Sequence, residues 1–136
     1  MIEAHYSIAV AGSRNWLERV DELRAIEDVH RLLDRLCDPR SDNAMLIHTR
    51  RQRQESGYPD HEVTVGVRGE RGAILFTDDA TGSWATFGDG PTTSPTYAGI
   101  AFPTHCEIPV SDIAIAISEF LTTCERPTLV PWQQVR

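Results

Sequence analysis

The side chains that could carry chemistry are five histidines, three cysteines and two adjacent aspartates, Asp78 and Asp79. The histidines and cysteines show no HExxH, paired CxxC or other zinc-ligand spacing, and His105-Cys106 is the one adjacent pair of soft ligands. Neighbouring residues of a strand point to opposite faces of a sheet, so these two side chains cannot easily share an ion. We therefore expect no metal site, and interpret the pair as a histidine at a loop end beside a buried cysteine.

The sequence also lacks the arrangements that activate a nucleophile or hold a nucleotide. It contains no Gly-x-Ser-x-Gly elbow, no GxGxxG and no phosphate loop. Cys124 falls on the apolar stripe of a predicted helix, where a thiol serves packing. Asp78 and Asp79 precede Gly82 in the manner of turn-forming residues. Since no base, nucleophile and orienting residue can be named together, we predict a protein that is not an enzyme and binds no cofactor.

Seven short segments have the composition and bounding turns of strands. The clearest is 61–68, where Val63, Val65 and Val67 alternate with Glu62, Thr64 and Gly66, so that one face is buried and the other is wet or lightly covered. Short turns join this segment to the next two and predict a three-stranded antiparallel meander. The expected strands are residues 6–10, 44–49, 61–68, 73–76, 84–87, 96–100 and 128–133.

Two segments have the apolar period of a helix. Residues 20–36 place Val20, Leu23, Ile26, Val29, Leu33 and Leu36 at three- and four-residue steps, and Asp38-Pro39 ends the pattern. The stronger stripe runs from Ile113 to Cys124 after Ser111 as a cap, and Arg126-Pro127 ends it. The assembled expectation is one α+β domain over residues 1–136, with an antiparallel sheet of about five to seven strands and two main helices packed against it.

The net charge of the chain limits the classes of molecule that it can bind. The formal net charge is −7, and from Gly69 onward eight acidic residues stand against three arginines, a net of −5. Such a surface repels phosphate backbones but suits a basic protein partner. The one basic cluster, Arg50-Arg51-Gln52-Arg53, has no interleaved aromatic residues and is more typical of a solvated loop. We expect no direct binding to nucleic acid.

Location and redox state follow from simple features. The start of the chain lacks the pattern of a signal peptide, and no apolar run is long enough to span a membrane, so we expect a cytoplasmic protein with no membrane partner. The three cysteines are an odd number with no close pair, which favours reduced thiols.

Aromatic residues beside acidic turns are candidates for partner contact. Trp84, Tyr97 and Trp132 belong in the core by default. However, Trp84 lies in a short strand among small polar residues and between acidic turns, which is what a hot spot against a basic partner needs. The candidate partner-binding residues are Asp78, Asp79, Trp84, Asp89 and Tyr97.

The order and spacing of motifs in the C-terminal half resemble the first-numbered family of Imm immunity proteins from bacterial polymorphic toxin systems. The resemblance covers roughly residues 60 to 134, and its most specific block runs from Glu107 to Trp132. The family pattern has Gly where this chain has Cys124. The matching motifs are Gly72-Ala73-Ile74-Leu75-Phe76-Thr77-Asp78, Trp84, Gly88, Tyr97, Phe102-Pro103, Glu107-Ile108-Pro109-Val110, Ala116, Glu119-Phe120-Leu121, Arg126-Pro127 and Trp132.

The resemblance implies a cytoplasmic protein that binds the toxin domain encoded beside it and blocks its active site. Members of this family are often linked to toxins that deaminate nucleic acid, and such a toxin would present a basic cleft. The alternative from another class is a small acidic secretion chaperone or adaptor for an effector protein. Neither interpretation fixes an oligomeric state.

Overall fold

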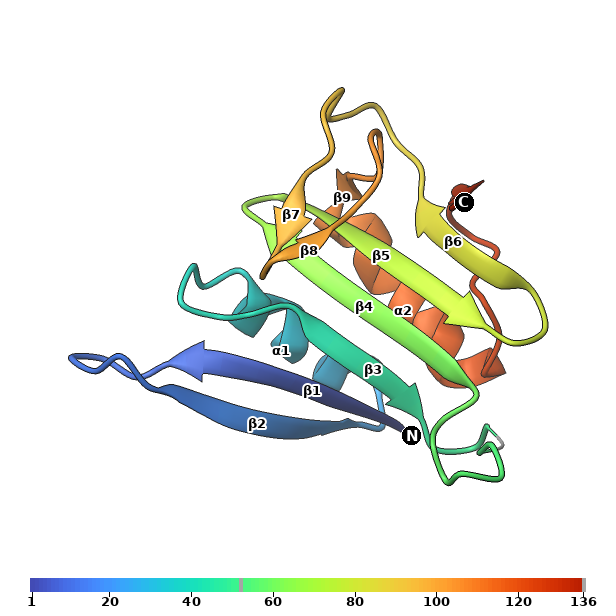
Figure 1. Ribbon diagram of the computed structural model, residues 1–136, viewed down its shortest axis with the longest axis horizontal. Helices are drawn as coiled ribbons and strands as arrows, with labels where there is room; N and C mark the ends of the chain where they lie inside the picture. The colour runs from blue at the N-terminus through green and yellow to red at the C-terminus, as the bar shows by residue number, and fades with distance from the viewer. Residues whose placement is uncertain (52, 136) are drawn as a thin grey trace.

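The computed structural model describes residues 1–51 and 53–135 as ten strands and two helices (Figure 1). The helices are α1 (Ile26–Leu36) and α2 (Val110–Thr123). The strands are β1 (Ile2–Ala9), β2 (Trp16–Leu23), β3 (Ala44–His48), β4 (His61–Arg68), β5 (Arg71–Asp78), β6 (Gly82–Thr86), β7 (Thr96–Tyr97), β8 (Ile100–Ala101), β9 (Ile108–Pro109) and β10 (Trp132–Gln134).

The main sheet is antiparallel and has eight strands. Seven follow the order β10-β6-β5-β4-β3-β1-β2, and β9 pairs with β5 beside this path. This confirms the α+β class with two helices and the meander of β4, β5 and β6. The sheet has one strand more than the expected range, because it gains the unexpected β2 and β9 while the strand expected at 96–100 falls in the separate β7–β8 pair.

Both helices lie on one face of the sheet, which we call the helix face (Figure 1). Their apolar stripes pack against the inward residues of the strands and form the main core. Phe120 of α2 lies near its centre, with edge-on ring contacts to Phe76 at 5.5 Å and to His48 at 5.3 Å between centroids. Because strand side chains alternate, the residues between these core positions point to the opposite face, which we call the open face.

The β7–β8 hairpin covers only part of the open face. Tyr97 and Phe102 pack there with Cys106 and Ala73 in a second small core. Gly66 of β4 makes this possible, because a Cβ atom at that position would lie 2.4 Å from the Tyr97 ring. The rest of the open face, over β2, β1, β3 and the first half of β4, has no covering element among the described residues (Figure 1).

The predicted helix over 20–36 is wrong at its start. Residues 16–23 form β2, which pairs with β1 along all eight residues from Ile2↔Leu23 to Ala9↔Trp16. The carboxylate of Asp28 accepts hydrogen bonds from the backbone N–H of Arg24 at 2.8 Å and of Ala25 at 3.1 Å. These contacts satisfy donors that a helix start leaves free, so α1 begins only at Ile26.

Other element boundaries also differ from expectation. The helix expected after a Ser111 cap begins at Val110, which places Ser111 in its first turn. The strand expected at 96–100 is the short β7–β8 hairpin, and the strand expected at 128–133 is the three-residue β10 paired with β6. No helix among the described residues is long and apolar enough to cross a membrane.

Cys124 ends α2 in the left-handed conformation, with φ of 64° and ψ of 4°. It is half-buried and lies beyond the last helical turn, so the expectation that it packs in the core stripe is wrong. Its backbone N–H donates to the carbonyl of Phe120 at 2.9 Å. A side chain in this conformation is crowded, and glycine is the residue that adopts it without strain.

Cys124→Gly should therefore stabilise the protein by about 1 kcal/mol, the approximate strain of one left-handed residue with a Cβ atom. Urea unfolding measured by circular dichroism checks this. Cys124→Ala is the matched control, since it removes the thiol but keeps the Cβ atom. Equal midpoints for the two variants would contradict the explanation.

Candidate functional site

The five predicted partner-binding residues do not form one patch. Asp78 ends β5 and Asp79 begins the turn that follows, whereas Asp89 lies in the loop beyond the other end of β6. Trp84 lies within β6 and Tyr97 within β7. Only Asp79 and Asp89 are exposed.

Asp78 is 5% exposed and fully engaged inside the chain. Its carboxylate accepts hydrogen bonds from the Thr81 backbone N–H at 2.7 Å and from the Thr81 hydroxyl at 2.6 Å. It also forms an ion pair with Arg51 at 3.2 Å. Burial by itself would raise the pKa of Asp78, but these contacts outweigh it and leave the pKa lowered. Asp78 thus fixes the β5–β6 turn from which Asp79 projects, and is not accessible to a partner.

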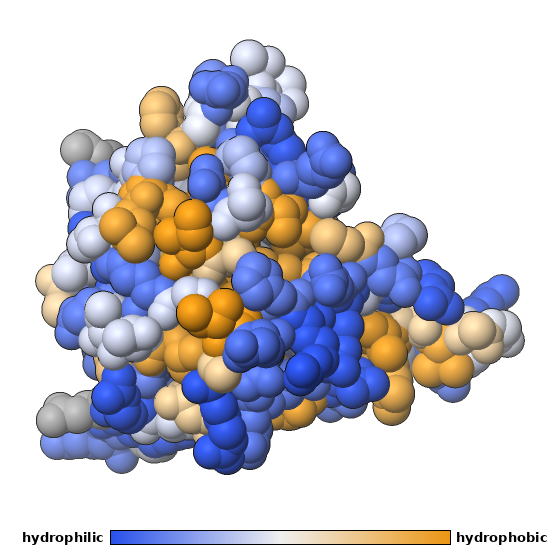
Figure 2. Space-filling model, turned by 180° about the vertical axis from the view of Figure 1, so that it is seen from behind, coloured by the Kyte–Doolittle hydropathy of each residue, from blue (hydrophilic) through white to orange (hydrophobic). Residues whose placement is uncertain are grey.

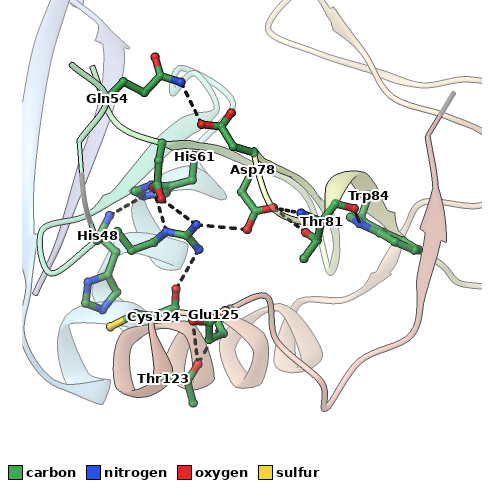
Figure 3. A network of polar contacts seen from close by, with 12 residues as sticks. His48, Gln54, His61, Asp78, Thr81, Trp84, Thr123, Cys124 and Glu125 are labelled. Carbon is green, nitrogen blue, oxygen red and sulfur yellow. Dashed lines mark hydrogen bonds and ion pairs between the residues drawn. The ribbon is translucent and has the colours of Figure 1, made fainter. Parts of the chain in front are cut away.

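Arg51, whose side chain is 11% exposed, holds this region together. Figure 3 shows the polar network around it, with His61, Asp78 and Cys124 labelled. Two nitrogens of the Arg51 guanidinium, Nε and Nη2, donate to the Asp60 carboxylate at 3.0 and 3.1 Å. The same guanidinium reaches Asp78, and Nη1 donates to the carbonyl of Cys124 at 3.1 Å. One side chain therefore joins the loop after β3, the end of β5 and the end of α2.

The basic cluster does not present a uniform charged loop. Arg51 is internal, Arg50 donates to the carbonyl of Thr122 and Arg53 donates to that of Gly57. Gln52, the fourth member, lies outside the described residues. These bonds tie the cluster to its own chain.

Two buried histidines extend the network toward the core. Atom Nε2 of the His61 ring accepts a hydrogen bond from the backbone N–H of His48 at 2.9 Å. The proton of the His61 ring is therefore on Nδ1, which donates to the Asp60 carboxylate at 2.8 Å. The His48 ring accepts the Arg50 backbone N–H at Nδ1, so its Nε2–H donates to the Leu121 carbonyl. Each ring is thereby held in one neutral tautomer. Burial is the main cause that lowers the pKa of both rings.

Trp84 is half-buried on the helix face and stabilises the same end of the sheet. Its indole N–H donates to the carbonyl of Thr81 at 2.8 Å. The guanidinium of Arg126 lies 3.9 Å from the centre of its ring and 5.9 Å from that of Trp132. This stacking is a cation–π contact that covers one face of the indole.

Tyr97 is buried over Gly66 and its hydroxyl donates to the Glu107 carboxylate. Burial, together with this carboxylate, holds the pKa of Tyr97 above its usual value. The Arg68 guanidinium lies 4.9 Å from the ring centre. Tyr97 anchors the β7–β8 hairpin and is not exposed for contact with a partner.

The structure gives little basis for chemistry at the candidate catalytic groups. The prediction for His105-Cys106 is confirmed, because His105 lies half-buried in a loop with φ of 59° and Cys106 is buried. Burial raises the pKa of the Cys106 thiol to about 11, which keeps it protonated. All three cysteines are free, and residues 1–51 and 53–135 contain no group of three potential metal ligands.

Sequence analysis missed a groove on the open face. Two hollows of about 370 and 410 Å³ lie side by side there, and Met45 and Glu62 line both. We call the two hollows together the open-face groove. Its exposed tyrosine, Tyr58, and the acidic Asp79 lie toward the β5–β6 turn. The alternation in 61–68 was the available signal, since it placed Glu62 and Thr64 on the less covered face.

Comparison with known proteins gives one finding at the level of family. A family model described as immunity protein Imm1 matches residues 18–134. The match includes most of β2 and all of α1 and β3, so it reaches further toward the N-terminus than the resemblance in the C-terminal motifs. No curated protein matches the chain.

Arg51→Ala should destabilise the protein by about 3 kcal/mol or more, because it leaves the Asp60 and Asp78 carboxylates without their buried cation. Arg53→Ala, in the same loop but exposed, should change stability by less than about 0.5 kcal/mol. Chemical unfolding of both variants measures the difference. Similar values for the two would show that the Arg51 network contributes little.

Stability should also fall when the pH drops below about 6.5, the ordinary pKa of histidine. The folded state lowers the pKa of His48 and His61, so the unfolded chain binds more protons and acid favours it. Thermal melts between pH 7.5 and 5 should show a decreasing Tm. His61→Gln should weaken this dependence and His30→Gln, at an exposed site, should not. An unchanged pH profile in His61→Gln would contradict the assignment.

Proposed function

We propose, on the premise that the chain belongs to the Imm1 family of immunity proteins, that it neutralises a deaminase-type toxin by covering the toxin's active site. Membership of this family makes it an immunity protein against a toxin. The nature of the toxin and the mode of inhibition are the parts that we infer. The family match across residues 18–134 is the observation that carries the proposal.

Charge supports a toxin that acts on nucleic acid. Such an enzyme needs cationic groups that hold phosphate, and an acidic protein can occupy the same groups. The chain has a net charge of −7, and Asp79 and Asp89 project from turns. An inhibitor of this kind works by occupancy and needs no catalytic group of its own.

The exposure of each predicted contact residue decides whether we assign it direct contact with the toxin or a positioning role. We assign direct contact to Asp79 and Asp89, because their carboxylates are accessible. Asp78 positions the turn that carries Asp79, and Tyr97 fixes the hairpin beside the open face. Trp84 has one ring face stacked against Arg126, so its contribution is to hold the sheet end in place.

The proposed site of action is the cytoplasm, where a toxin that deaminates nucleic acid would meet its substrate. The protein would act there as a stoichiometric inhibitor. Deaminase activity should then fall linearly with added protein and vanish near one equivalent. A substoichiometric effect would instead indicate turnover and an enzyme.

The deciding experiment is co-expression of this protein with the toxin domain encoded beside it. We expect host survival, recovery of a stable complex by pull-down, and an association rate that falls steeply as salt increases. An unrelated acidic protein of similar size is the control and should not protect. A stable complex without protection would favour the chaperone or adaptor alternative, and absence of both would refute the proposal.

A further inference from the structure

The uncovered part of the open face carries a row of side chains across four strands. The strand register places Val20 beside His5, His5 beside Met45, and Met45 beside Thr64, which is 6% exposed and ends the row. Val20 is 56% exposed and Met45 is 42% exposed. Val20 on the edge strand β2 and Met45 on the interior strand β3 are thus apolar side chains open to solvent, on a sheet face that a folded protein usually covers.

Acidic side chains border this row on both sides. Glu18, Asp42 and Glu62 line one hollow of the open-face groove, and Asp79 lines the other. None of the four takes part in an ion pair with another described residue. The groove thus combines an apolar floor with carboxylates available to an outside cation.

Nearby basic groups offset only part of the charge of this face. Glu3 and Glu22 stand directly opposite each other on β1 and β2, but Glu22 pairs with Arg24 at 2.7 Å and Glu3 lies 3.6 Å from His5. The arginine that lines the groove, Arg19, lies 3.9 Å from Asp21, whose carboxylate pairs more closely with Arg35 at 2.5 Å. In the hollow that Arg19 lines, the carboxylates of Glu18, Asp42 and Glu62 outnumber its one guanidinium group.

The helix face offers a different surface. A hollow of about 800 Å³ runs between α1 and α2, and the exposed Ile26, Ile115 and Leu129 line it. Apolar residues gather on this side of the molecule among hydrophilic ones (Figure 2). Its acidic residue, Glu119, is occupied by hydrogen bonds from the backbone of Thr128 and Leu129. This hollow therefore offers no free carboxylate to a basic partner, and Arg24 and His30 line it as well.

We propose that the open-face groove is the surface that binds the toxin, and that it receives a basic segment of the toxin whose arginine or lysine reaches Glu62. This inference rests on the proposed function and specifies its surface. The long aliphatic stem of arginine or lysine packs on Met45, while the charged end pairs with the carboxylate. Asp79, at one end of the groove, belongs to the same contact surface.

The test is the dissociation constant for a catalytically inactive form of the neighbouring toxin domain, measured by calorimetry with four variants of the full chain. Glu62→Lys should weaken binding at least about 30-fold, the loss typical of a hot spot. Met45→Ala should also weaken it, because it removes the apolar floor without adding a carboxylate that a basic segment could use. Asp34→Lys makes the same charge change at an exposed position of α1 and should change affinity less than about threefold, as should Ile115→Asp on the helix face.

Thermal melts must show that each variant remains folded, and Glu62→Lys is suited to this because its side chain is exposed. Glu62→Gln adds a milder variant that removes only the charge, and it should flatten the salt dependence of affinity. Wild-type affinity in both Glu62→Lys and Met45→Ala would overturn the inference while leaving the immunity function intact. Loss of binding in Ile115→Asp alone would place the toxin on the helix face. Failure of the unmodified protein to bind the toxin would refute the proposed function itself.

Discussion

The guanidinium group of Arg51 is the contact on which the arrangement of the C-terminal half depends. It lies almost out of solvent and joins Asp60, Asp78 and the carbonyl of Cys124, groups that come from three separate segments of the chain. A buried cation is stabilised only when such partners surround it, so the three segments must be positioned together. Asp78 in turn holds Thr81, whose carbonyl receives the Trp84 indole. These contacts hold the β5–β6 turn in place, and with it the exposed Asp79.

Local patterns in the sequence were sufficient for much of the fold. The alternation in 61–68 predicted β4, the short turns predicted the meander, and the apolar stripe after Pro109 predicted α2. The error at β2 has a clear cause, because residues 20–23 fit the helical period and a strand equally well. The pairing of all eight residues of β2 with β1 decides in favour of the strand, and this long-range contact cannot be seen in the local sequence.

The site could be predicted less well than the fold, for a related reason. The sequence identified acidic and aromatic residues but not their exposure. Asp78 is buried because Arg51, 27 positions earlier in the chain, lies against it, and Tyr97 is buried because Gly66 leaves room for its ring. The open-face groove was hidden for the same reason, since Val20, Met45 and Glu62 become neighbours only through the register of four strands. Composition alone showed the net charge of −7, on which the proposal of a basic partner rests.

The exposed row on the open face has a consequence for how this protein can change over generations. In β4, Val63 and Val65 point into the core while Glu62 and Thr64 point away from it, so on the proposed binding surface folding and recognition would use separate positions of the strand. A substitution at Glu62 leaves the packing of the core untouched. If the toxin changes, this protein can change the outward-facing residues of its strands, while the inward-facing residues between them preserve the fold.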